Sequence, residues 1–280
     1  MRVGIVGYGH LGQYLVERIQ EVGTEHDIEI DFVWNRSTDK LEGKVEKSLI
    51  LETLEDCSTR KVDLIVEVCH PEICKNYGEK FLQHCNLFVG SPTAFADQET
   101  EKILRSAVVK FGHSLYVPSG ALWGATDIKK MADRGSLKGL KVTMKKHPSS
   151  FRLHGNLEEI NSTAFQSNHP VTLYEGPVRK LCPLAPNNVN TMAAAAIAGH
   201  NLGFDEVVGC LISDSSLLEW HIVEVDVLGP TNSDNGNTFN VTTTRKNPAS
   251  AGAVTGNATF ASFFSSLIRA RNQGSGIHMC

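Results

Sequence analysis

The chain has 280 residues, of which 41% are hydrophobic and 21% charged, the composition of an ordinary globular protein with one large or two compact domains. A formal net charge of −4, without a basic stripe, argues against a nucleic-acid partner. The apolar run after Met1 stops at Gly7, too short for a signal peptide or a membrane span, so we expect a cytoplasmic protein with no membrane partner. The cysteines form no CxxC pair and no cluster with metal-ligand spacing, so we expect reduced thiols and no metal.

The first third of the chain alternates short β-branched runs with amphipathic stretches, which is the pattern of a parallel sheet with crossover helices. The expected strands are 2–6, 28–34, 62–68, 87–90 and 114–117, and the expected helices are 9–22, 72–84 and 97–111. In the first helix Leu11, Leu15 and Ile19 recur at helical spacing. These elements predict an α/β fold that opens with a Rossmann domain, a doubly wound parallel sheet, over residues 1–124.

After residue 124 the strand candidates become longer, which predicts an α+β catalytic domain with an open-faced mixed sheet over residues 125–247. The expected strands are 139–145, 207–212, 221–228 and 238–245, with an alanine-rich helix over 189–200. Asn247-Pro248 indicates the start of a last helix, because the asparagine side chain caps a helix and proline tolerates its first turn. We expect that helix, 248–273, to pack back on the first domain through a phenylalanine-rich face.

A glycine-rich turn links the first strand to the first helix. Gly7, Gly9 and Gly12 fit the GxGxxG pattern, with His10 and Leu11 between them. Such glycines permit a tight turn, the approach of a pyrophosphate to the backbone and close helix–strand packing, and the helix N-terminus attracts the anion. Because the motif follows a strand and opens a helix, it predicts a dinucleotide site. The alternative is a purely structural glycine turn.

The residues that end the second expected strand bear on the choice of dinucleotide. In NAD-specific sites an acidic residue about twenty positions after the glycines binds the adenosine ribose. Here that position is Asn35, followed by Arg36. An amide beside a guanidinium does not repel a 2′-phosphate, and Arg36 is able to pair with one, so we expect NADP and/or NAD as the cofactor. The alternative is that Arg36 is a solvated loop residue.

A series of short segments carries a resemblance that covers essentially the whole chain. The segments are EVCHPE at 67–72, SPTAFAD at 91–97, PSGA at 118–121, NVN at 188–190, His221, and KNP at 246–248. In residues and order they resemble the L-aspartate dehydrogenase family, most of all its animal branch. The resemblance implies a Rossmann domain, a catalytic domain with an open-faced sheet, and a homodimer.

The same resemblance implies the NAD(P)-dependent oxidation of L-aspartate to iminoaspartate, which water converts to oxaloacetate and ammonia. His221 matches the family's catalytic histidine. The positions that match contacts near the nicotinamide are Cys69, His70, Ala121 and one of Asn188 or Asn190. Two departures matter: Asn35 replaces an acidic residue seen in some members, and Trp123 stands where microbial members tend to have a small residue.

Chemistry supports a histidine in this role without the family. A hydride leaves the Cα of an amino acid only when the amine is neutral, and the imine then needs an activated water. An imidazole that titrates near neutrality serves as both base and acid. The alternative is that His221 is a hydrogen-bonded residue of the hydrophobic core, because it shares a strand face with Val223 and Val225.

A dicarboxylic amino acid also needs cationic or amide donors, for which guanidinium is the best match. Lys145, His147 and Arg152 form a basic stretch that is a candidate for binding the substrate, the alternative being a solvated polar loop. Two other functions stay open: a related two-domain oxidoreductase that acts on another small acid, and a dinucleotide-binding protein without turnover.

Overall fold

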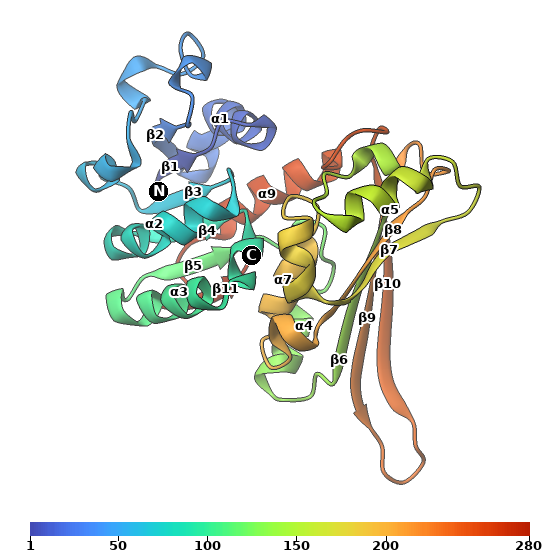
Figure 1. The fold of residues 1–280 in the computed structure, drawn as a ribbon. Coiled ribbons are helices and arrows are strands. Elements are labelled where there is room, and N and C mark those ends of the chain that lie inside the picture. The colour runs from blue at the N-terminus through green and yellow to red at the C-terminus, as the bar shows by residue number, and fades with distance from the viewer. The chain divides into compact units, whose positions relative to one another are not determined.

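The computed structural model describes residues 1–280, with the exception of the Asn257 side chain (Figure 1). The chain divides into two compact units. The first comprises Met1–Pro118, Phe263–His278 and Cys280, and the second comprises Ser119–Ser262 and Met279. Among the described residues, no helix has both the length and the apolar character needed to cross a membrane.

The first unit contains a 6-stranded sheet in the order β11-β5-β4-β3-β1-β2. Its strands are β1 (Arg2–Val6), β2 (Glu29–Trp34), β3 (Leu64–Glu67), β4 (Asn86–Val89), β5 (Ser114–Val117) and β11 (Gly276–Met279). Strands β1 to β5 pair in parallel, and the strand order reverses direction between β1 and β3. In doubly wound sheets, ligands bind at such a switch point, beyond the carboxyl ends of the strands.

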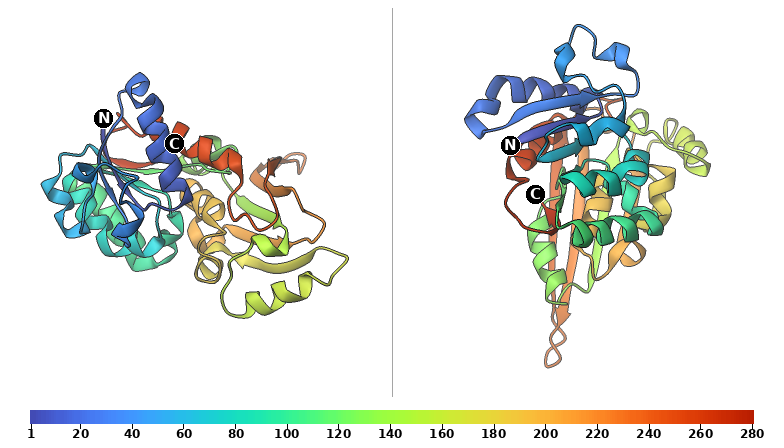
Figure 2. Two further views of the ribbon diagram at one scale, coloured as in Figure 1. Left: turned by 90° about the horizontal axis from the view of Figure 1, so that it is seen from above. Right: turned by 90° about the vertical axis from the view of Figure 1, so that its left-hand side faces the viewer.

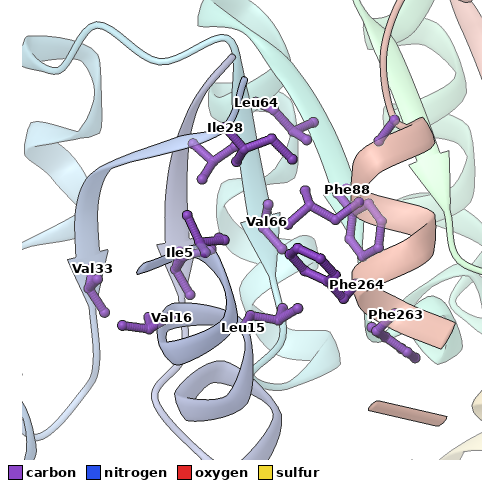
Figure 3. Close-up of a cluster of buried hydrophobic side chains, with 14 of the residues drawn as sticks. Ile5, Leu15, Val16, Ile28, Val33, Leu64, Val66, Phe88, Phe263 and Phe264 are labelled. Carbon is purple, nitrogen blue, oxygen red and sulfur yellow. The ribbon is translucent and has the colours of Figure 1, made fainter. Parts of the chain in front are cut away.

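Helices cover both faces of this sheet, as Figure 2 shows. They are α1 (His10–Val22), α2 (Pro71–His84), α3 (Gln98–Phe111) and the end of α9 (Asn257–Arg269). Leu15 and Ile19 of α1 lie one turn apart on its buried side, so they pack with the sheet residues Ile5 and Val66 in one hydrophobic cluster (Figure 3). Phe263 joins this cluster from α9, which places the end of that helix on the Rossmann sheet.

The second unit contains a 5-stranded mixed sheet in the order β10-β9-β6-β8-β7. Its elements are α4 (Ala125–Asp133), β6 (Gly139–Lys146), α5 (Asn156–Ala164), β7 (Val171–Pro177), α6 (Val178–Leu181), α7 (Asn190–Ala198), α8 (Gly203–Glu206), β8 (Val208–Ser213), β9 (Trp220–Thr231) and β10 (Thr238–Pro248). Buried and part-exposed residues alternate along much of β9, because one face of the sheet is covered and the other is open. The predicted fold, a Rossmann domain with an open-faced mixed sheet, is confirmed.

The open face of this sheet, on the side of Lys145 and Glu224, carries ion pairs between its strands. Lys145 Nζ lies 2.8 Å from Glu224 Oε1, and Lys141 Nζ lies 2.7 Å from Glu175 Oε1. Apolar side chains remain among these ion pairs, and Leu228 is 47% exposed.

The last helix begins later than predicted. Asn247 and Pro248 end β10, where they pair with His221 and Trp220 of β9, and α9 begins at Asn257. A residue before proline prefers an extended backbone, which suits a strand as well as a helix cap. The long β9–β10 hairpin, visible in Figures 1 and 2, therefore continues through the predicted helix start.

Two strands were not predicted from the sequence. Strand β7 contains Gly176 and Pro177, which interrupt its apolar pattern, and β11 has only 4 residues near the end of the chain. Both are edge strands of their sheets, so tertiary pairing with one neighbour determines them.

Candidate functional site

The three glycines of the turn have different surroundings in the first unit. Gly7 has a φ of +114°, a backbone conformation that favours glycine, and a Cβ at Gly12 would lie 1.9 Å from the Gly7 carbonyl oxygen. A Cβ at Gly9 would meet no protein atom within 4 Å. Gly9 also precedes α1 without a side-chain cap on the helix N-terminus. Gly7 and Gly12 therefore serve the fold, whereas the open space at Gly9 fits a pyrophosphate at the start of α1.

Of the two residues that follow β2, Asn35 serves the fold, whereas Arg36 is open to solvent. Asn35 Oδ1 accepts a hydrogen bond from Tyr8 N at 3.1 Å, and Asn35 Nδ2 donates to Ser37 O at 2.9 Å. This amide thus ties the glycine turn to the end of β2. The Arg36 side chain is exposed and makes no hydrogen bond or ion pair with the described residues. His10 and Leu11 open α1, His10 exposed and Leu11 half-buried.

A buried carboxylate at the end of β3 holds the loops that follow β3 and β4. Glu67 Oε1 accepts hydrogen bonds from Cys69 N at 2.7 Å and His70 N at 2.9 Å, and Glu67 Oε2 accepts one from Ser91 N at 3.0 Å. Ser91 Oγ and Cys74 Sγ also donate to this carboxylate. Burial raises the pKa of Glu67, whereas these hydrogen bonds lower it.

Sequence reasoning did not single out Glu67. An acidic residue that ends the otherwise apolar strand LIVE was the available signal. Cys69 and His70, the residues that it positions, are both exposed at the carboxyl end of the sheet. Burial and the neighbouring Glu67 raise the pKa of the Cys69 thiol, which favours a neutral thiol over a nucleophilic thiolate.

His221 lies in the second unit, buried near the start of β9. Burial lowers the pKa of its imidazole to about 4, and the nearby Lys146 ammonium acts in the same direction, while a hydrogen bond with the backbone of Ala253 raises it. His221 Nε2 is buried and has no hydrogen-bond partner among the described residues. The ring is therefore neutral at physiological pH and has a nitrogen available as a proton acceptor.

Lys146 is a buried cation close to His221 that sequence reasoning also missed. Its side chain is 3% exposed, and its Nζ donates to Val254 O at 3.0 Å. Burial lowers the pKa of this ammonium to about 8, so it is mostly protonated at pH 7. Successive residues of a strand point to opposite faces, so Lys145 lies on the open face, paired with Glu224. In the sequence, the alternation of faces along this strand was the available signal that Lys146 is buried and Lys145 is not.

The other predicted residues of this unit lie in loops and at helix ends. Asn188 is buried, with its Oδ1 accepting from Arg152 N at 2.8 Å and its Nδ2 donating to Ser150 O at 3.2 Å. The exposed Arg152 guanidinium donates to the carbonyl oxygens of Ser149 and Phe151. The His147 ring is hydrogen-bonded to Ser149 Oγ at 2.7 Å. These contacts hold the loop after β6 in place.

Ala121 and Asn190 complete the set of predicted cofactor contacts. Ala121 is buried, in the turn before α4, and Asn190 is the first residue of α7 and half-buried. Trp123, which departs from the pattern of the microbial family members, is 66% exposed.

Comparisons with known proteins identify related proteins for both parts of the chain. Residues 127–266 match the family model described as "Aspartate dehydrogenase, C-terminal", and residues 7–118 match "Homoserine dehydrogenase, NAD binding domain". An aspartate dehydrogenase domain-containing protein of Xenopus tropicalis is 56% identical over 280 residues, covering 100% of this chain and 98% of the relative. The L-aspartate dehydrogenase of Methanocaldococcus jannaschii is 27% identical over 203 residues, 71% of this chain and 74% of that protein.

Among solved structures, aspartate dehydrogenase from Thermotoga maritima matches with a TM-score of 0.70 and 20% sequence identity, covering 98% of this chain and 97% of that one. At this identity the match shows a common fold. The family models and the vertebrate relative confirm the resemblance first noted in the short sequence segments. The chain belongs to the aspartate dehydrogenase family.

Proposed function

We propose that this chain is an NAD(P)-dependent dehydrogenase that oxidises L-aspartate to iminoaspartate, which water converts to oxaloacetate and ammonia. The observation that carries the proposal is the neutral, buried His221, whose Nε2 has no partner among the described residues. The family membership and the L-aspartate dehydrogenases among its relatives support aspartate as the substrate.

The residues of the first unit fit a dinucleotide. In this proposal Gly9 and the N-terminus of α1 hold the pyrophosphate, and Arg36 binds near the adenosine ribose. The positions proposed to lie at the nicotinamide end are Cys69, His70, Ala121, Asn188 and Asn190. When bound, the nicotinamide accepts the hydride from the substrate Cα. NADP and NAD are both proposed cofactors, because no carboxylate follows β2 at position 35.

His221 supplies the proton chemistry in this proposal. An ammonium group must lose a proton before hydride leaves the adjacent carbon, and the neutral imidazole is able to accept that proton at Nε2. Once that proton has passed to solvent, the same nitrogen is able to accept a second proton, from the water that attacks the imine. The hydrogen bond with the backbone of Ala253 holds the ring in place. Burial keeps the ring neutral across the physiological pH range, and its pKa of about 4 lies below the near-neutral value that we expected for an acid–base group, so it is a weaker base than a free imidazole.

The test is a substrate screen that follows the absorbance of the reduced cofactor. L-aspartate with NADP or NAD is compared with the reverse reaction, oxaloacetate plus ammonia, and with other small acids. We expect turnover with aspartate, and a loss of about a hundredfold or more in His221→Ala with cofactor binding retained.

Three other results would redirect the proposal. Turnover with another small acid and none with aspartate would identify a related oxidoreductase. Cofactor binding without turnover of any substrate would identify a dinucleotide-binding protein. A folded His221→Ala variant with wild-type turnover would return His221 to a structural role in the core.

We also propose that the chain forms a homodimer through the open face of the five-stranded sheet. The family resemblance supports this assembly, and so does Leu228, which is 47% exposed on that face. The ion pairs Lys141–Glu175 and Lys145–Glu224 lie on the same face and would form a polar part of the interface.

A further inference from the structure

A row of buried polar side chains crosses four strands of the second sheet. Lys146 of β6 pairs with Ser213 of β8, and Asn247 of β10 pairs with His221 of β9. The antiparallel register that sets Lys145 opposite Ile222 puts Lys146 opposite His221. Because residues paired across strands point to the same face, these four side chains lie side by side. Their exposed fractions are 0% for Ser213, 3% for Lys146, 5% for His221 and 3% for Asn247.

The cation in this row lacks an anion. Within the described residues Lys146 makes no ion pair; its Nζ has one hydrogen bond, with Val254 O, and lies 5.9 Å from the centre of the Phe151 ring. An ammonium has three donors, and a buried charge is costly unless an opposite charge or several acceptors accompany it. The neighbouring Ser213 Oγ donates to Asn161 Oδ1 at 2.7 Å, and no hydrogen bond from Lys146 to Ser213 is present among the described residues.

The other end of the row has acceptors without donors. His221 Nε2 and Asn247 Oδ1 are both buried, and neither has a hydrogen-bond partner among the residues that the structure describes. The amide nitrogen of Asn247, Nδ2, donates to His221 O at 3.4 Å. The amide oxygen, Oδ1, is therefore the Asn247 atom that needs a hydrogen-bond donor. Buried polar atoms without partners are rare in folded proteins and call for a ligand or water.

We infer that this row is the binding site of an α-amino acid, in which Lys146 binds a carboxylate and Asn247 Oδ1 accepts a hydrogen bond from the amino group beside His221. Adjacent strands lie about 4.8 Å apart, so the three residues span roughly 10 Å, which suits a small amino acid with one contact at each end. The inference rests on the proposed function and deepens it, because it assigns the two recognition residues next to the base.

A purely structural reading makes different predictions. If Lys146 only fastened the segment around Val254, replacing it would lower the melting temperature and leave ligand affinity unchanged. In our inference the charge is unpaired without ligand, so an apolar side chain of similar length leaves the unfolding stability unchanged or raises it. Ligand affinity and stability therefore separate the two readings.

The experiment is calorimetric titration of the full chain at pH 7 with L-aspartate and with succinate, which lacks the amino group. Titrations run with and without saturating NADPH, because the reduced cofactor does not oxidise aspartate. Lys146→Met is expected to weaken both ligands by about tenfold or more, the loss when a charged hydrogen-bond partner is removed. Asn247→Leu is expected to weaken aspartate by about threefold or more and to leave succinate unchanged.

Two matched controls use the same substitutions on the same strands. Lys141→Met removes a lysine of β6 that pairs with Glu175 on the open face, and Asn240→Leu changes an exposed residue of β10. Neither is expected to alter the affinity for either ligand. If Lys146→Met does not fold, Lys146→Gln takes its place, because glutamine keeps an N–H donor on a side chain one atom shorter and removes the charge.

Wild-type affinity for both ligands in a folded Lys146→Met or Lys146→Gln variant would overturn the inference. Failure of this binding-site inference is distinguishable from failure of the proposed enzymatic function. If the wild type binds aspartate through Lys146 and does not oxidise it with either cofactor, the site stands and the proposed activity fails. If aspartate is oxidised with the same KM in wild type and Lys146→Gln, the activity stands and the site fails.

Discussion

Gly9 and Gly12 belong to one motif, but a side chain at these positions would meet different surroundings. At Gly9 a Cβ meets no protein atom within 4 Å, and the backbone φ of −77° suits any residue. Gly9→Val is therefore expected to fold and to weaken cofactor binding by about tenfold or more, because the side chain occupies the approach to the backbone. Cofactor fluorescence titration and thermal melting measure the two effects.

Gly12→Val is the contrasting variant. A Cβ there would lie 1.9 Å from Gly7 O, so this change is expected to disrupt the turn and lower the melting temperature by several degrees or more. If Gly9→Val binds the cofactor like wild type, the pyrophosphate does not lie over Gly9.

Arg36 is the residue that we expect to distinguish the two dinucleotides. Its guanidinium is exposed, without an ion pair in the described part of the chain, so it is available to a 2′-phosphate. Arg36→Ala is expected to lower affinity for NADP by about tenfold and to leave NAD within about twofold, since only NADP carries that phosphate. Parallel titrations with both cofactors test this, and an unchanged NADP/NAD ratio would make Arg36 a solvated loop residue.

The pKa of His221 predicts a specific pH dependence of stability. Folding lowers this pKa from 6.5 to about 4, so the unfolded chain binds the proton more readily. Stability contributed by the neutral ring is complete above pH 6.5 and is lost as the pH falls toward 4, by about 3 kcal/mol at most. His221→Asn lacks this loss, so its stability relative to wild type should improve between pH 7 and pH 4.5.

Urea denaturation of both proteins at the two pH values measures this difference. A constant stability difference would mean that the His221 pKa is not lowered by folding. At pH 7 the His221 ring is neutral in both the folded and, mostly, the unfolded chain. The stability difference between His221→Asn and wild type at that pH therefore measures the change in packing, and the further change at pH 4.5 measures the titration of His221.

At the scale of elements, Glu67 connects the ends of β3 and β4. Its carboxylate accepts from three backbone N–H groups, which have no freedom to turn away. In Glu67→Gln one oxygen becomes a donor that faces these donors, so we expect destabilisation by about 1–3 kcal/mol and weaker cofactor binding through the displaced Cys69–His70 loop.

Glu79→Gln is the control, because Glu79 makes only an exposed ion pair with Lys110 at 3.4 Å. That variant is expected to change the free energy of unfolding by less than about 1 kcal/mol. Equal urea midpoints for Glu67→Gln and wild type would show that the loops are held by other contacts.

At the scale of the whole molecule, the open sheet face is the basis for the proposed homodimer. Light scattering at micromolar concentration is expected to give twice the chain mass of 30.6 kDa. Leu228→Asp places a charge on this face and should yield monomers, because burying an unpaired carboxylate is costly. Val109→Asp, at an 81% exposed position of the first unit, is the control. A monomeric wild type would exclude this dimer.

Local pattern was enough to predict most of the elements of the first unit. The β-branched runs, the periodic Leu15 and Ile19, and the glycine turn act over neighbouring residues, and their spacing is the same before and after folding. The edge strands β7 and β11 and the true start of α9 were not predictable in this way. They depend on pairing with distant strands, which outweighed the cap signal at Asn247-Pro248.

By itself the sequence determined the Rossmann fold, the glycine-rich turn between β1 and α1, the family resemblance and His221 as a candidate base. Only the tertiary structure decided which of two adjacent lysines is buried beside that histidine. It did so because strand register, a non-local property, brings Lys146, His221 and Asn247 into one row from three strands far apart in the chain. Burial of that row then lowers the pKa of His221 to about 4 and that of Lys146 to about 8, values that no local pattern contains.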